Sequence, residues 1–219
     1  MNNVTRRLLV FLLGLPLLLA SIFAFPQYHH PIFLLIVVAA SGLSALELKN
    51  FFPADITAYP GANVAIILLG AAPPVATIMT LVLGVPLILL PAMTATILGT
   101  VMVSQVFRRD PERFRTINAT VTSHLFIALY PGFMAAHVVV LTTLEESVFL
   151  LLVFLLSVYL NDSMAYATGM LLGKRSRPLV PISPNKTRIG FAGGLFASIV
   201  VAVAAAALLP ALFPGGLLK

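Results

Sequence analysis

The chain has 219 residues, of which 60% are hydrophobic and only 9% are charged. This composition excludes a water-soluble globular protein and indicates an integral membrane protein. The absence of cysteine excludes disulfides, thiolate metal sites and cysteine nucleophiles.

Seven apolar segments are long enough to cross a membrane, which needs about 20 mainly apolar residues. We expect them at about 8–26, 31–48, 62–82, 84–107, 120–141, 147–172 and 191–213. The division between the third and fourth is the weakest, because Gly84, Pro86 and Pro91 interrupt one apolar stretch. A cleaved secretory signal is the alternative for the first segment, but its apolar run is longer than a usual signal core. The sequence therefore predicts an all-α, polytopic transmembrane bundle forming one domain over 1–219.

The basic residues predict the orientation of this bundle. With the N-terminus in the cytoplasm, every Lys and Arg except Lys219 falls in a cytoplasmic segment, as the positive-inside rule requires. Topology and anionic headgroups then explain the net charge of +6, and nucleic-acid binding is not needed. We expect a multi-pass protein of the bacterial inner (cytoplasmic) membrane whose site faces the cytoplasm.

The sixth segment contains an acid, Asp162, at membrane depth, where a charge costs about 2.5–3.5 kcal/mol. At about 100° per residue, Asp162, Tyr166, Gly169 and Gly173 share one helical stripe, with Ala165 beside it. We expect the carboxylate to line a wet or protein-lined cavity and to bind Mg²⁺, which suits one or two carboxylates with substrate phosphates. The alternative is a small-residue helix interface in which Asp162 is paired or protonated.

The loop before the seventh segment predicts an anion site. Ser183 and Pro184 favour a helix start, with the serine as N-cap and the proline as first helical residue. Residues 185–188 would then occupy the first turn, where cations oppose the helix dipole. A bound anion would resolve that conflict, so we expect Lys186, Ser183 and Thr187 to hold a di- or triphosphate. The alternative is that these charges anchor a cytoplasmic loop.

The order of these elements resembles the phosphatidate cytidylyltransferase family, whose members carry D-x-x-A-Y-x-x-G, a Gly-Lys step and S-P-x-K-T-x-x-G-x-x-G-G. Here these elements are DSMAYATG at 162–169, Gly173-Lys174, and SPNKTRIGFAGG at 183–194. The resemblance implies a membrane nucleotidyltransferase of phospholipid synthesis that converts CTP and phosphatidic acid to CDP-diacylglycerol and pyrophosphate with Mg²⁺. CTP, phosphatidic acid and membrane lipids are therefore the expected partners, and homo-oligomerisation stays open.

Within this reaction, Asp162 would hold Mg²⁺ and Lys186 would neutralise phosphate charge, so both are candidate catalytic residues. The candidate substrate-binding residues are Lys174, Arg175, Ser183, Asn185 and Thr187. The hydroxyl and amide side chains would orient phosphate oxygens, and the two loop cations would attract anionic substrates.

Two features depart from the family pattern. Ile189 stands where the family usually has Glu or Gln, and the family's His-Gly-Gly and Asp-Arg-x-Asp signature does not occur before Lys219. We therefore expect a chain that is truncated at its C-terminus relative to the family and that does not catalyse the reaction efficiently by itself. The alternatives are a CTP-dependent polyprenol or phytol kinase, or a non-catalytic membrane protein or small transporter with Asp162 as ion site.

The four histidines are expected to be unrelated to this site. His29 and His30 precede the second segment, and we expect both to be solvated. His124 and His137 lie thirteen residues apart on the fifth segment, which places them well apart around a helix. We expect core polar contacts for this second pair instead of a shared metal.

Overall fold

The computed structural model describes residues 3–57, 62–86, 89–106, 116–173, 178–180 and 183–208. The chain divides into two compact units, Met1–Val148 and Phe149–Lys219. The candidate site lies in the second unit.

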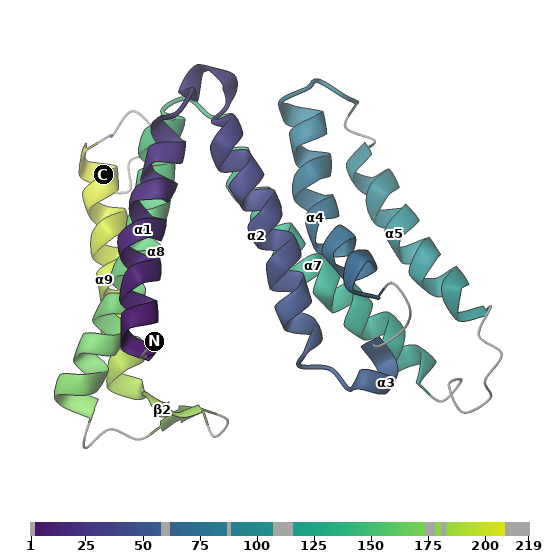
Figure 1. Ribbon diagram of the computed structural model, residues 1–219. Helices are drawn as coiled ribbons and strands as arrows, with labels where there is room; N and C mark the ends of the chain where they lie inside the picture. The colour runs from purple at the N-terminus through teal and green to yellow at the C-terminus, as the bar shows by residue number, and fades with distance from the viewer. Residues whose placement is uncertain are drawn as a thin grey trace. The chain divides into compact units, whose positions relative to one another are not determined.

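The first unit is built from helices (Figure 1). Their bounds are α1 Asn3–Phe23, η1 Pro26–Tyr28, α2 Pro31–Lys49, α3 Ala54–Thr57, α4 Ala62–Leu81, α5 Leu89–Val106 and α7 Ile117–Leu141. Helix α4 packs against both α2 and α7, and the core includes buried Ala45, Ile66 and Ile127. A Cβ on Gly132 would lie 2.8 Å from the Gly70 carbonyl oxygen. Small residues thus let α4 and α7 approach to backbone contact, as is common between membrane helices.

The second unit contains most of α8, Ser147–Leu172, and all of α9, Arg188–Leu208 (Figure 1). Between them lie two short strands, β1 Pro178–Val180 and β2 Ser183–Thr187, which pair antiparallel with Pro178 opposite Thr187 and Val180 opposite Ser183. The hairpin leads directly into α9, since β2 ends at the residue before the helix begins.

Among the described residues, five helices are long and apolar enough to cross a membrane: α2, α4, α7, α8 and α9. This confirms the prediction of an all-α polytopic membrane bundle. The predicted first and fourth segments correspond to α1 and α5. The fourth begins later than predicted, at Leu89, because Gly84 has φ of 70°, a left-handed backbone that interrupts the apolar stretch. The seventh begins earlier, at Arg188, and its predicted end falls outside the described residues.

His30 is fully buried, so the prediction that it is solvated was wrong. Its Nδ1 lies 2.6 Å from the Ile22 carbonyl oxygen, and its Nε2 lies 2.9 Å from the Ser147 hydroxyl. Because a carbonyl can only accept, Nδ1 donates to Ile22 in this arrangement, and Nε2 shares the second hydrogen bond with Ser147. The imidazole therefore joins the end of α1 to the start of α8, a long-range contact that residues 29–30 alone do not reveal.

The histidines of α7 bond to their own helix. His124 Nδ1 and His137 Nδ1 each lie 2.8 Å from the carbonyl oxygen four residues earlier, those of Thr120 and Phe133. The described part of the chain contains no group of three metal-binding side chains. Neither observation supports a shared histidine metal site on this helix.

Candidate functional site

Helix α9 begins at Arg188, so the predicted helix start at Ser183 was wrong. Residues 183–187 are extended instead, because they pair with β1. The N-cap is Thr187, whose Oγ1 accepts a hydrogen bond of 3.1 Å from the Gly190 N–H, the third helical residue. Lys186 consequently precedes the helix and does not lie in its first turn.

Helices α8 and α9 cross at backbone contact distance. A Cβ on Gly190 would lie 2.7 Å from the Ala165 carbonyl oxygen, and one on Gly194 would lie 2.8 Å from the Asn161 carbonyl oxygen. The Asn161 side-chain N–H donates to the Ser198 hydroxyl at 2.9 Å and ties the two helices together. The glycines of the sequence motif therefore serve close helix packing.

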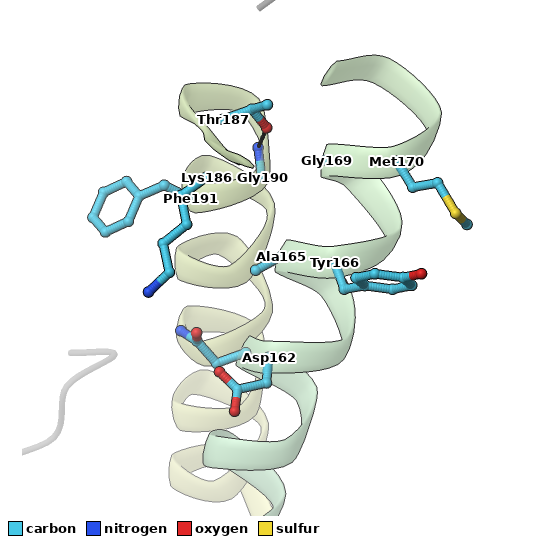
Figure 2. Close-up of a pocket in the computed structure, with 10 residues that line it drawn as sticks. Asp162, Ala165, Tyr166, Gly169, Met170, Lys186, Thr187, Gly190 and Phe191 are labelled. Atoms are coloured by element: carbon cyan, nitrogen blue, oxygen red, sulfur yellow. Dashed lines mark hydrogen bonds between the residues drawn. The ribbon is translucent and has the colours of Figure 1, made fainter. Parts of the chain in front are cut away.

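A cavity of about 670 Å³ lies along this crossing, within the size range of ligand sites. Its lining residues are Asn161, Asp162, Ala165, Tyr166, Gly169, Met170, Lys186, Thr187, Gly190 and Phe191. Figure 2 shows Tyr166 and Met170 projecting from α8 on one side and Phe191 projecting from α9 on the other. Between these apolar walls lie Ala165, Gly169 and Gly190. Because these residues have at most a methyl side chain, the backbones of both helices border the cavity.

Two opposite charges line this cavity, the carboxylate of Asp162 and the ammonium of Lys186. Figure 2 shows the Lys186 side chain extending from the start of α9 toward the level of Asp162. Neither side chain forms a hydrogen bond or an ion pair within the part of the chain that the structure describes. Both groups are exposed and so are available to bind a cation and an anion side by side.

The donor set of the cavity fits Mg²⁺. The ion prefers oxygen ligands and commonly takes one or two carboxylates while keeping waters and substrate phosphates. Asp162 supplies one carboxylate, and a nucleotide bound at Lys186 would supply phosphate oxygens. That Asp162 holds Mg²⁺ stays a prediction.

The other predicted site residues differ in how much of each the structure describes. Lys174 and Arg175 lie outside the described residues, and for Ser183 and Asn185 the structure describes the backbone in β2 but not the side chains. Thr187 lines the cavity, with its hydroxyl engaged by Gly190.

Sequence reasoning missed four residues that line the cavity: Asn161, Met170, Gly190 and Phe191. Met170 follows Tyr166 by one helical turn, which is a signal for a shared face. The positions of Asn161 and Phe191 depend on how α8 and α9 cross, and no local pattern indicates that crossing.

The segment that builds this cavity is the one that carries the motifs, and the family match extends well beyond it. Residues 5–217 match the model of the cytidylyltransferase family. The chain belongs to this family. The predicted resemblance is therefore confirmed.

Two relatives show how far the similarity to named proteins reaches. The chain is 39% identical over 80 residues to the phosphatidate cytidylyltransferase of Aquifex aeolicus (strain VF5), covering 36% of this chain and 29% of the relative. It is 45% identical over 62 residues to that of Staphylococcus aureus (strain COL), covering 28% and 24%. The matched part thus spans less than a third of either relative. No solved structure matches the chain.

Proposed function

We propose that this protein takes part in the transfer of the cytidylyl group of CTP to phosphatidic acid, which forms CDP-diacylglycerol and pyrophosphate, and we expect turnover by these residues alone to be slow. The observation that carries the proposal is the cavity at the crossing of α8 and α9, where Asp162 and Lys186 present opposite charges that no other described residue pairs with. Membership of the cytidylyltransferase family supports it, as do the names of the relatives that match part of the chain.

The reaction is a displacement at phosphorus. A phosphate oxygen of phosphatidic acid attacks the α-phosphorus of CTP, a new P–O bond forms, the bridging bond to the β-phosphate breaks, and pyrophosphate leaves. No covalent intermediate with the protein is required, so catalysis depends on positioning both reactants and on neutralising their negative charge.

Lys186 fits the role of triphosphate ligand, because its ammonium lines the cavity and forms no ion pair with any residue that the structure describes. It can bind a phosphate without breaking an existing ion pair. Mg²⁺ bound at Asp162 would supply further charge neutralisation to the phosphates. Ser183 and Asn185 would orient phosphate oxygens in this proposal, as would the O–H of Thr187, whose oxygen accepts from the Gly190 N–H. Lys174 and Arg175 would attract anionic substrates.

The proposal also assigns an orientation, since CTP is a cytoplasmic substrate. The start of α9, with Lys186 and Arg188, and the end of α2, with Lys49, would face the cytoplasm of a bacterial inner membrane. The apolar walls of the cavity would then meet the bilayer, from which a lipid substrate arrives.

A double-label assay tests the reaction type. Membranes containing the protein are incubated with Mg²⁺, phosphatidic acid and CTP labelled with ³H in cytosine and with ³²P at the γ-phosphate. Cytidylyl transfer places ³H in the lipid fraction and ³²P in pyrophosphate. A CTP-dependent lipid kinase would instead place ³²P in the lipid, and absence of label from the lipid would reject both enzymatic functions.

Matched variants test the two charges. Asp162→Asn should lower the rate by at least about 100-fold, whereas Glu145→Gln, an exposed acid on the α7–α8 loop, should not. Lys186→Gln should weaken CTP binding by about 10- to 100-fold. Arg188→Gln removes an exposed cation two residues away that does not line the cavity, and it should have little effect. Equal effects of the two cation variants would reject Lys186 as the phosphate ligand.

A further inference from the structure

We infer that Thr187 is a positioning residue: its side chain seats in a socket of three glycines and so sets where Lys186 stands relative to Asp162. The glycine socket consists of Gly169 on α8, Gly173 directly after the end of α8, and Gly190 on α9. This inference rests on the proposed function for the role of Lys186, but the socket itself is a feature of the helix crossing.

The socket has room for Thr187 because all three positions lack a Cβ. A Cβ on Gly173 would lie 3.0 Å from Thr187 Cγ2 and 3.1 Å from its Oγ1. Those on Gly169 and Gly190 would lie 3.3 Å and 3.1 Å from Oγ1. Each distance is shorter than the roughly 3.5–4.0 Å of an ordinary contact, so side chains at these positions would press on the threonine from both helices.

The hydroxyl of Thr187 also closes the start of α9. Its Oγ1 accepts the Gly190 N–H at 3.1 Å, satisfying one of the N–H groups that a helix start leaves without an intrahelical partner. The same side chain therefore contacts α8 through the glycines and caps α9 through this hydrogen bond. Loss of the glycine contacts or of the cap would therefore loosen the hold of the two helices on Thr187, the last residue of β2.

This seating determines the direction of Lys186. In an extended strand, successive side chains point to opposite faces, and Lys186 and Thr187 are the last two residues of β2. With Thr187 directed toward α8, Lys186 is directed away from the helix contact and extends along the cavity (Figure 2). Asp162 lies on the same helix as the socket glycine Gly169, roughly 10 Å of helix rise away. The seating of Thr187 thus sets the spacing of the two charges.

A substitution at Gly173 distinguishes a positioning role of Thr187 from direct contact between Thr187 and substrate. It is buried and does not line the cavity, so a substitution there cannot remove a substrate ligand. The three atoms nearest to a Cβ at Gly173 all belong to Thr187. Gly173→Ala therefore acts on Thr187 specifically.

The first experiment measures CTP affinity of the purified protein in detergent by equilibrium dialysis with radiolabelled CTP. Gly173→Ala should weaken binding by about 2- to 30-fold, the range that loss of a helix cap represents. Adding Thr187→Ser should restore part of the affinity, because it removes the Cγ2 methyl that the alanine meets while keeping the cap. Gly99→Ala, where a Cβ meets nothing within 4 Å, should bind CTP like the unmodified protein.

The second experiment measures hydrogen–deuterium exchange at the start of α9 and does not depend on CTP. Thr187→Val removes the acceptor of the Gly190 N–H and should accelerate its exchange by about 2- to 30-fold, whereas Thr187→Ser should keep it slow. Unchanged exchange in Thr187→Val, or unchanged CTP affinity in Gly173→Ala, would overturn the inference. If the unmodified protein binds no CTP, the proposed function fails, and the exchange result alone decides whether Thr187 caps α9.

Discussion

The crossing of α8 and α9 can be tested by adding a single methyl group at Gly194, which is buried. A Cβ there would lie 2.8 Å from the Asn161 carbonyl oxygen and 3.1 Å from Ala165 Cβ. An ordinary contact is longer than the first distance by roughly 0.7 Å or more. The nearest atom belongs to the backbone, so the helices themselves must separate to admit the methyl.

The expected cost follows from two opposing effects. Overpacking costs about 1–3 kcal/mol, and replacing glycine by alanine within a helix returns up to about 1 kcal/mol. Because the added methyl meets backbone at 2.8 Å, the overpacking cost should lie in the upper part of that range, about 2–3 kcal/mol. Gly194→Ala should therefore destabilise the protein by about 1–2 kcal/mol. For a protein of this size, that loss corresponds to a fall in Tm of about 2–8 °C.

Size-exclusion chromatography of the detergent-solubilised protein after heating measures this Tm. The control is Gly99→Ala on α5, where the added Cβ meets nothing within 4 Å, so it should keep or slightly raise the Tm. If Gly194→Ala proves as stable as Gly99→Ala, α8 and α9 do not cross at backbone contact distance, and the cavity is not formed by this crossing.

Three further predictions concern topology, the buried histidine and the cavity charge. Because the chain contains no cysteine, an impermeant thiol reagent should label Glu145→Cys from outside intact cells and Arg188→Cys only after permeabilisation; reversed labelling would contradict the orientation. His30→Ala should lower the free energy of unfolding by about 1–3 kcal/mol, since the buried hydrogen bonds to Ile22 and Ser147 are lost, and an unchanged Tm would exclude this role. CTP affinity should fall between about 0.01 M and 0.15 M salt, because exposed Lys186 is screened as the Debye length shrinks from about 30 Å to 8 Å, whereas salt-independent binding would argue against an ionic contact.

The helical membrane architecture follows from local sequence properties. Long apolar runs must form helices in a bilayer, because each backbone polar group needs a partner within its own segment. The same reasoning placed Asp162 in a cavity, since a carboxylate at membrane depth cannot face lipid, and the structure places it there. Helical periodicity also placed Tyr166 and Gly169 on the cavity face.

The local conformation near Lys186 required the tertiary structure. Ser183 and Pro184 carry strong helix-start preferences, yet residues 183–187 form a strand, because pairing with β1 outweighs a propensity of about 1 kcal/mol. The N-cap of α9 is consequently Thr187 and not Ser183, and Lys186 precedes the helix. Similarly, His30 is buried because its two partners come from distant segments of the chain.

The sequence by itself determined the fold class, the family and the acid within the membrane, because these depend on composition, periodicity and a contiguous motif. The tertiary structure decided how α8 and α9 cross, which residues line the cavity and which residue caps α9. Those features depend on contacts between residues far apart in the chain, such as Gly190 with Ala165 and Asn161 with Ser198. Such contacts form when two helices pack together, and neither helix specifies them alone.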